Sequence, residues 1–134
     1  MIGHALGGEV ARAPTGWQVG IKETRVKVAQ PWMVPPVDAF RILHMNGDQI
    51  LTLPERLRVL GSTDGVPVSV IAVGDHFIGF QGHPEFDPAY SAVLMEARRG
   101  VLIPEDVVDL GLSSLAVGPD TRLLSDWITS FMAG

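Results

Sequence analysis

Fifteen glycines and ten prolines divide the 134-residue chain into short segments, and this constrains its fold more than any other feature. Proline removes a backbone donor and fixes φ, and glycine interrupts regular elements, so few segments can be long. No fixed-period repeat or low-complexity tract appears among them. Because 46% of the residues are hydrophobic and 19% are charged, the chain can bury one globular core. We therefore expect a single domain over residues 1–134.

Charge and cysteine content exclude several classes of protein. The sequence has no cysteine, which excludes a disulfide scaffold, a thiolate metal site and a cysteine nucleophile within it. A net charge of −5 argues against a nucleic-acid partner, because such proteins carry clustered positive charge. No apolar run approaches the roughly 18 residues of a membrane helix, and the N-terminus lacks the basic region of a signal peptide. We expect a cytoplasmic protein with neither a membrane nor a nucleic-acid partner.

Alternation of apolar and polar residues predicts strands in the first two thirds of the chain. Trp17, Val19 and Ile21 alternate with polar residues or glycine, which is the period of a half-buried strand. Two apolar runs joined by Gly74 and Asp75 predict a hairpin in a central sheet position. The expected strands are 17–21 with 26–28, 40–43, 56–60, 68–73 and 76–80.

Three helices are expected after residue 85. Asp87 is an N-cap followed by proline, which predicts a helix that ends near Gly100. A second, short helix should span residues 104–111. Asp120 should cap the last helix, whose apolar residues form one stripe that must lie on the sheet. The stripe comprises Leu123, Leu124, Trp127, Ile128 and Phe131. Strands followed by covering helices make an α/β layered domain the expected class.

The segment 79–86 contains the most informative side chains for function. His83 and Glu85 flank Pro84, whose fixed φ and effect on His83 let both side chains project toward the same side. Glu85 could then orient the imidazole of His83, as in the base and orienter of a catalytic triad. A structural turn histidine and a metal site that adds Asp87 are the alternatives, and the spacing leaves all three open.

Four blocks, in the same order, resemble the second part of a class I glutamine amidotransferase domain. They are residues 5–10, 16–20, 46–49 and 79–85. The stretch GFQGHPEF is similar to the triad signature of that family, and Asp75, His76 and residues 96–99 are similar to its free-standing, GMP-synthase-like branch. The resemblance implies a partial flavodoxin-like layered domain: a mostly parallel sheet with a β-hairpin and covering helices.

In this family a cysteine attacks the side-chain amide of glutamine and releases ammonia, while a histidine relays protons and a glutamate holds the histidine. The resemblance implies that His83 is the base, that Glu85 is its orienter, and that glutamine or a related small-molecule amide is the ligand. A synthase or another ammonia acceptor would then be the partner. No metal is expected, and no dinucleotide or phosphate loop suggests a cofactor.

The missing nucleophile is the main departure from the family pattern. The block that matches residues 5–10 closes the helix that begins at the cysteine, so the family pattern would place the cysteine before Met1. We therefore expect an N-terminally truncated, C-terminal portion of the domain that is inactive alone. The competing expectation is a non-catalytic interaction module, or a half-domain that assembles with a partner supplying the cysteine. An unpaired sheet edge would then favour self-association.

A second departure lies just before Gly47. The family commonly has Ser-His-Gly-Asp, with backbone groups contacting bound glutamine, whereas this chain has Met45 and Asn46 in the first two positions. Met45 and Asn46 are therefore candidate substrate-binding residues, with an ordinary turn as the alternative. His44 lies far from the His-Glu pair in sequence, and we expect it to be a packed or exposed side chain rather than a ligand.

Overall fold

The computed structural model describes residues 9–12, 16–52 and 55–133. Strands occupy the first two thirds and helices the last third, as the sequence predicts. The strands are β1 (Glu9–Arg12), β2 (Gln18–Val26), β3 (Ala39–Asn46), β4 (Asp48–Thr52), β5 (Leu57–Thr63), β6 (Val66–Val73) and β7 (Phe77–Phe80). Of the block at residues 5–10, the first four lie outside the described residues and the last two lie in β1.

Every strand pair in the described part of the chain is antiparallel, so the expectation of a mostly parallel sheet is wrong. Five strands form one sheet in the order β3-β2-β5-β6-β7, and β1 pairs with β4 in a second, two-stranded sheet. The connections explain the direction of the strands. Only residues 64–65 join β5 to β6, and residues 74–76 join β6 to β7, whereas parallel neighbours need a crossover of about a dozen residues. The predicted hairpin is confirmed as β6 and β7, but β7 is an edge strand of the sheet and does not have the central position expected of it.

The helices are α2 (Pro88–Arg98), α3 (Glu105–Ser114) and α4 (Thr121–Ala133), with a short 3-10 helix η1 (Leu115–Val117). Helix α2 begins as predicted, because the Asp87 side chain accepts a hydrogen bond of 2.7 Å from the Tyr90 backbone N–H. Helix α3 continues past Gly111, where it was expected to stop. A Cβ on Gly111 would lie 2.7 Å from Met95 Sδ and 2.8 Å from Val19 Cγ2. This glycine therefore permits close packing instead of ending the helix.

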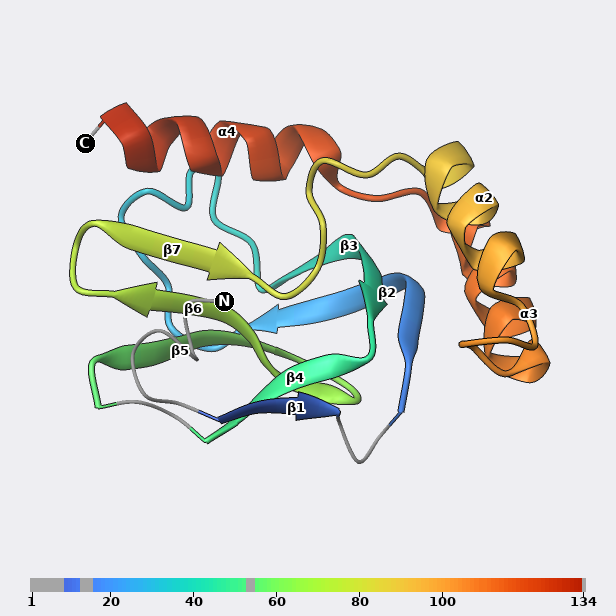
Figure 1. Cartoon of the computed structure of the whole chain (residues 1–134). Coiled ribbons are helices and arrows are strands. Elements are labelled where there is room, and N and C mark those ends of the chain that lie inside the picture. The colour runs from blue at the N-terminus through green and yellow to red at the C-terminus, as the bar shows by residue number, and fades with distance from the viewer. Residues whose placement is uncertain (1–8, 13–15, 53–54, 134) are drawn as a thin grey trace.

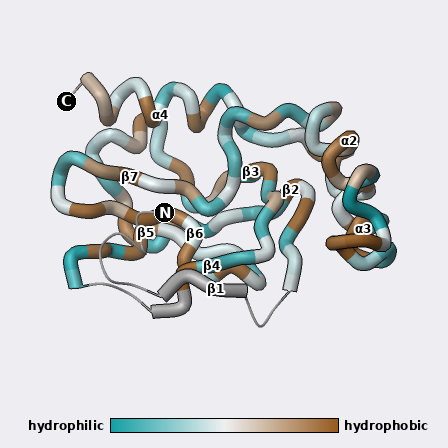
Figure 2. The backbone as a smooth tube through the Cα atoms, viewed as in Figure 1, coloured by the Kyte–Doolittle hydropathy of each residue, from teal (hydrophilic) through white to brown (hydrophobic). Residues whose placement is uncertain are grey.

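Helix α4 lies along one side of the five-stranded sheet, as predicted (Figure 1). Hydrophobic and hydrophilic stretches alternate along it (Figure 2). Leu124 and Trp127 are buried against strand residues that include Phe40. The Trp127 ring meets the Phe40 ring edge to face at 5.4 Å, and its Nε1–H donates to the Pro35 carbonyl at 2.9 Å. Burial of such an aromatic side chain is a major contribution to the core.

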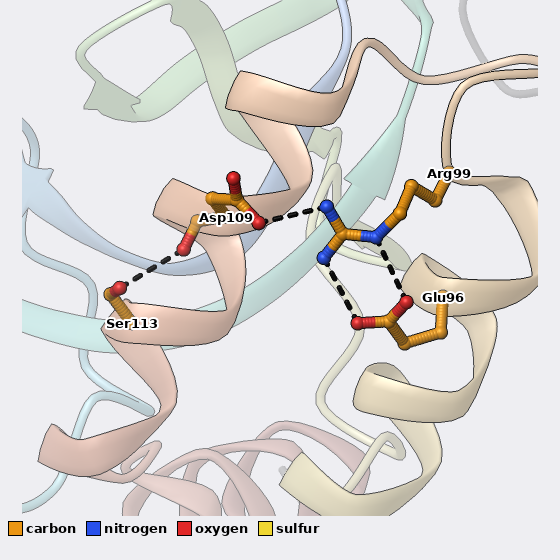
Figure 3. Close-up of polar contacts among 4 residues, drawn as sticks. All are labelled: Glu96, Arg99, Asp109 and Ser113. Carbon is orange, nitrogen blue, oxygen red and sulfur yellow. Dashed lines mark hydrogen bonds and ion pairs between the residues drawn. The ribbon is translucent and has the colours of Figure 1, made fainter.

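Helices α2 and α3 pack beside one another at one end of the sheet, where α3 contacts β2 (Figure 1). Arg99 joins the two helices: its Nε and Nη2 donate to the Glu96 carboxylate at 2.9 and 3.0 Å, and its Nη1 donates to Asp109 at 2.8 Å (Figure 3). The hydrogen bonds from Arg99 lower the pKa of Glu96, and those to Glu96 and Asp109 raise the pKa of Arg99. Across the described residues, the helices are too short or too polar to span a bilayer.

Candidate functional site

The loop after β7 returns to β3, at the opposite edge of the five-stranded sheet. The His83 backbone N–H donates to the Leu43 carbonyl at 2.7 Å and forms an isolated antiparallel bridge. Because β7 and β3 are the two edge strands, this bridge brings the edges of a curled sheet together. Gly82 is buried at the contact, and a Cβ there would lie 2.9 Å from the Leu43 carbonyl oxygen. The approach that positions His83 therefore requires glycine at position 82.

His83 and Glu85 lie side by side in this loop. Nδ1 of His83 is 2.8 Å from Oε1 of Glu85, and the side chains are 33% and 62% exposed, so the pair faces solvent. The ring of Phe86 stacks on the imidazole at 4.1 Å with an interplanar angle of 8°. An ionised carboxylate only accepts hydrogen bonds, so the bond to Glu85 requires a proton on Nδ1 of His83. Of the two ring nitrogens, Nε2 is then the one that a neutral imidazole leaves with a lone pair.

Two cavities meet at His83. The first, which we call the β3 cleft, has a volume of about 370 Å³ and is lined by Met45, Asn46, Gly47, Asp48, Phe80, Gln81 and His83. The second, the α4 cavity, has a volume of about 420 Å³ and lies against Ile128, Phe131 and Met132 of α4, with His83 and Glu85 at its margin. Glu85 lines the α4 cavity and is not among the residues of the β3 cleft. His83 lines both cavities, so its imidazole lies where the two meet.

The end of β3 thus brings Met45 and Asn46 to the same cleft as His83, although about 40 residues of sequence separate them. Gly47 forms a bend between β3 and β4, so the turn expected there is present and also lines a cavity. Gln81 also lines the cleft. It belongs to the GFQGHPEF stretch, but the sequence predicted no role for it. Its Nε2 donates to the Asp48 carbonyl at 3.3 Å.

His44 is a packed side chain, as expected, but it contacts a candidate site residue. Its Nδ1 lies 3.1 Å from Oδ1 of Asn46, and the residue is 0% exposed. Burial lowers the pKa of His44 to about 4, so the imidazole is neutral at physiological pH. Residues two apart in a strand project to the same side. This spacing is the sequence signal that could have linked His44 to Asn46.

Asp87, the third residue of the metal-site alternative, has a different partner. Asp87 caps α2 through its carboxylate, with the Tyr90 N–H at 2.7 Å. Within residues 9–12, 16–52 and 55–133, no three histidine, aspartate or glutamate side chains are grouped so that they could hold a metal ion. The arrangement that the structure does contain is an imidazole and a carboxylate where the two cavities meet.

Comparison with known proteins finds sequence relatives in Arabidopsis thaliana. No family model matches it. Over its whole length it is 27% identical to Gamma-glutamyl peptidase 2 and 30% identical to Gamma-glutamyl peptidase 5, both of Arabidopsis thaliana. It covers 56% of each, so the chain spans about half the length of these curated relatives.

Solved structures share the fold at lower sequence identity. A glutamine amidotransferase of Thermotoga maritima matches 98% of this chain with a TM-score of 0.73 and 20% identity, and 56% of that protein is covered. A glutamine amido transferase of Methylobacillus flagellatus matches 98% of the chain with a TM-score of 0.70 and 15% identity, and 58% of that protein is covered. The antiparallel strands and three helices described above are thus a recurring part of a larger fold.

Proposed function

We propose that this chain carries the proton-transfer part of an amide-hydrolysing site. The premise is that the chain belongs to the class I glutamine amidotransferase-like proteins. The observation that carries the proposal is the 2.8 Å contact between His83 and Glu85 at the margin of the β3 cleft. The ligand would be glutamine or a γ-glutamyl amide, bound in that cleft beside Met45 and Asn46. The names of the sequence relatives and of the structural neighbours both support an amide of a γ-glutamyl group.

The proposed chemistry needs a thiol that this sequence does not contain. His83 Nε2 takes the thiol proton, and the thiolate attacks the carbonyl carbon of the amide. The resulting imidazolium gives its proton to the departing ammonia or amine, which leaves a glutamyl thioester. Water, deprotonated by His83, then attacks the thioester and releases glutamate and the thiol. Glu85 accepts the Nδ1–H throughout, so it fixes the tautomer and stabilises the imidazolium.

The sulfur and the oxyanion donors would come from polypeptide outside residues 1–134. The relatives are nearly twice as long as this chain, which leaves room in them for a segment of that kind. In this proposal the chain is the C-terminal portion of a complete domain, either within a longer protein or in assembly with a second polypeptide. Alone, it should release no ammonia from L-glutamine at an enzymatic rate, because neither His83 nor water replaces a thiolate in covalent catalysis.

A chimera tests the proposed roles. This chain would replace the matching part of Gamma-glutamyl peptidase 2, and hydrolysis of L-glutamine and γ-glutamyl-p-nitroanilide would be measured. We expect activity in the chimera and a loss of about 10²–10⁴-fold in kcat for His83→Ala, because a positioned acid–base group contributes a factor of this size. Glu85→Gln should lower kcat with little change in KM, since it keeps the shape of the side chain and removes its charge.

The matched control is His76→Gln, which changes an exposed histidine that lines neither cavity. It should leave kcat unchanged. An active chimera in which His83→Ala is as fast as the unsubstituted protein would refute the proposed role of His83. Rapid ammonia release by the 134-residue chain alone would refute the need for an external thiol.

A further inference from the structure

Two buried polar atoms near the β3 cleft have no hydrogen-bond partner among the residues that the structure describes. They are Nε2 of His44 and Nδ2 of Asn46. His44 is 0% exposed and Asn46 is 7% exposed. Leaving a buried donor unpaired is energetically costly, and most buried polar groups in native proteins are paired. The unpaired amide donor of Asn46 therefore points to a partner that the fold itself does not supply.

The orientation of the Asn46 amide follows from its neighbour. Oδ1 lies 3.1 Å from Nδ1 of His44, and His44 does not line the β3 cleft, whereas Asn46 does. Oδ1 is therefore turned toward the interior, and Nδ2 is on the other branch of the planar amide. Because Oδ1 can only accept, Nδ1 of His44 must carry the proton. The opposite tautomer would turn the amide and direct Oδ1 toward the cleft.

The surroundings keep His44 neutral. Burial is the main cause, and the positive charge of Lys22 and the nearby His83 act in the same direction. A neutral ring with its proton on Nδ1 holds Asn46 without adding a charge to the wall of the cleft. The residues that line the cleft therefore include Asn46, whose uncharged amide donor is buried and unpaired, and His83.

We propose that His44 is a positioning residue that holds the Asn46 amide, so that Nδ2 is the donor offered by the β3 cleft to a carboxylate or carbonyl oxygen of its ligand. This inference deepens the proposed function and rests on it for the identity of the ligand. It assigns a side-chain contact to Asn46, in addition to any contact made by the backbone of residues 45–47. It also assigns a role to His44, which does not reach the ligand.

The test uses the 134-residue chain, labelled with nitrogen-15, and two signals in its NMR spectrum. The first is the protonation pattern of the His44 ring in the free protein, where we expect the proton on Nδ1. The second is the side-chain NH2 of Asn46 during titration with L-glutamate, where we expect a saturable shift. A proton on Nε2 of His44, or an Asn46 NH2 signal that glutamate leaves unchanged, overturns the inference.

Variants separate positioning from simple packing. Asn46→Asp exchanges the donor for an acceptor of the same shape and should weaken glutamate binding about 10–100-fold, the size of a hydrogen bond to a charged group. Gln30→Glu is the charge-matched control, because it makes the same amide-to-carboxylate change at a residue outside the cleft, and it should bind glutamate normally. Equal affinities of these two variants would count against the inference.

His44→Leu should also weaken binding, and His44→Gln should restore part of it, because glutamine can again donate to Oδ1 of Asn46. If His44→Leu does not fold, the ring tautomer and the Asn46 signal of the unsubstituted chain still decide the question. If the chain binds glutamate through Asn46 but the chimera is inactive, the proposed function is refuted and this inference stands. If the chimera hydrolyses its substrates but His44 has the opposite tautomer, the proposed function stands and this inference is refuted.

Discussion

The buried imidazole of His44 should make the stability of this protein fall between pH 6.5 and pH 4. The pKa is about 6.5 for an unperturbed histidine, and burial lowers it to about 4 in the fold. In that interval the unfolded chain binds a proton at this residue and the folded chain does not, so acid favours unfolding. Each pKa unit corresponds to about 1.4 kcal/mol, so His44 alone removes roughly 3 kcal/mol below pH 4.

The measurement is urea unfolding of the unsubstituted chain and of His44→Gln at pH 7.5, 6, 5 and 4.5. At pH 5 the His44 contribution should amount to about 2 kcal/mol. The variant lacks this titration. Between pH 7.5 and pH 5, the unsubstituted chain should therefore lose about 2 kcal/mol more of its free energy of unfolding than the variant loses. Carboxylates and the other histidines titrate in both proteins, and the comparison cancels their effects.

His76→Gln provides the control, because it makes the same substitution at a histidine that is exposed in the fold. Its stability curve should run parallel to that of the unsubstituted chain. Two parallel curves for His44→Gln and the unsubstituted chain would refute the reasoning, since they would mean that His44 takes up its proton as readily in the fold as in the unfolded chain.

Three further substitutions test the packing that supports the site. Trp127→Ala should lower the free energy of unfolding by about 3–5 kcal/mol, because it removes a fully buried ring and its bond to Pro35, and urea unfolding would measure this; a loss below 1 kcal/mol would contradict the burial. Gly111→Ala should destabilise by about 1–3 kcal/mol despite the better helix propensity of alanine, because its Cβ meets Met95, and an increase in thermal stability would show that the contact can relax. Arg99→Met should speed amide hydrogen exchange in α3 at low salt, and the difference from the unsubstituted chain should shrink as salt screens the ion pairs; equal exchange at low salt would mean that Arg99 does not hold the helices together.

Local chemistry predicted most of the elements. The N-cap at Asp87 and the apolar stripe of α4 depend on neighbouring residues, and both appear where the sequence indicated. The prediction of a mostly parallel sheet was wrong because it was taken from the resemblance to a whole family. The two residues between β5 and β6 allow only a hairpin, so connection lengths alone would have predicted antiparallel pairing.

The candidate site was partly accessible from sequence. The spacing of His83 and Glu85 suggested an imidazole held by a carboxylate, and their side chains lie 2.8 Å apart. The role of His44 was not accessible, because it depends on complete burial and on which branch of the Asn46 amide faces inward. Likewise, Gly111 was assigned a helix stop because a sequence does not show how closely a helix approaches its neighbours.

The bond between the His83 N–H and the Leu43 carbonyl ties the position of the imidazole to the path of β3. The same strand ends at Asn46, three residues further along the chain. Any force that bends β3 near Asn46 is therefore transmitted to the backbone of His83. In the proposed function, a ligand in the cleft would thus be mechanically linked to the alignment of His83 through a single short stretch of strand.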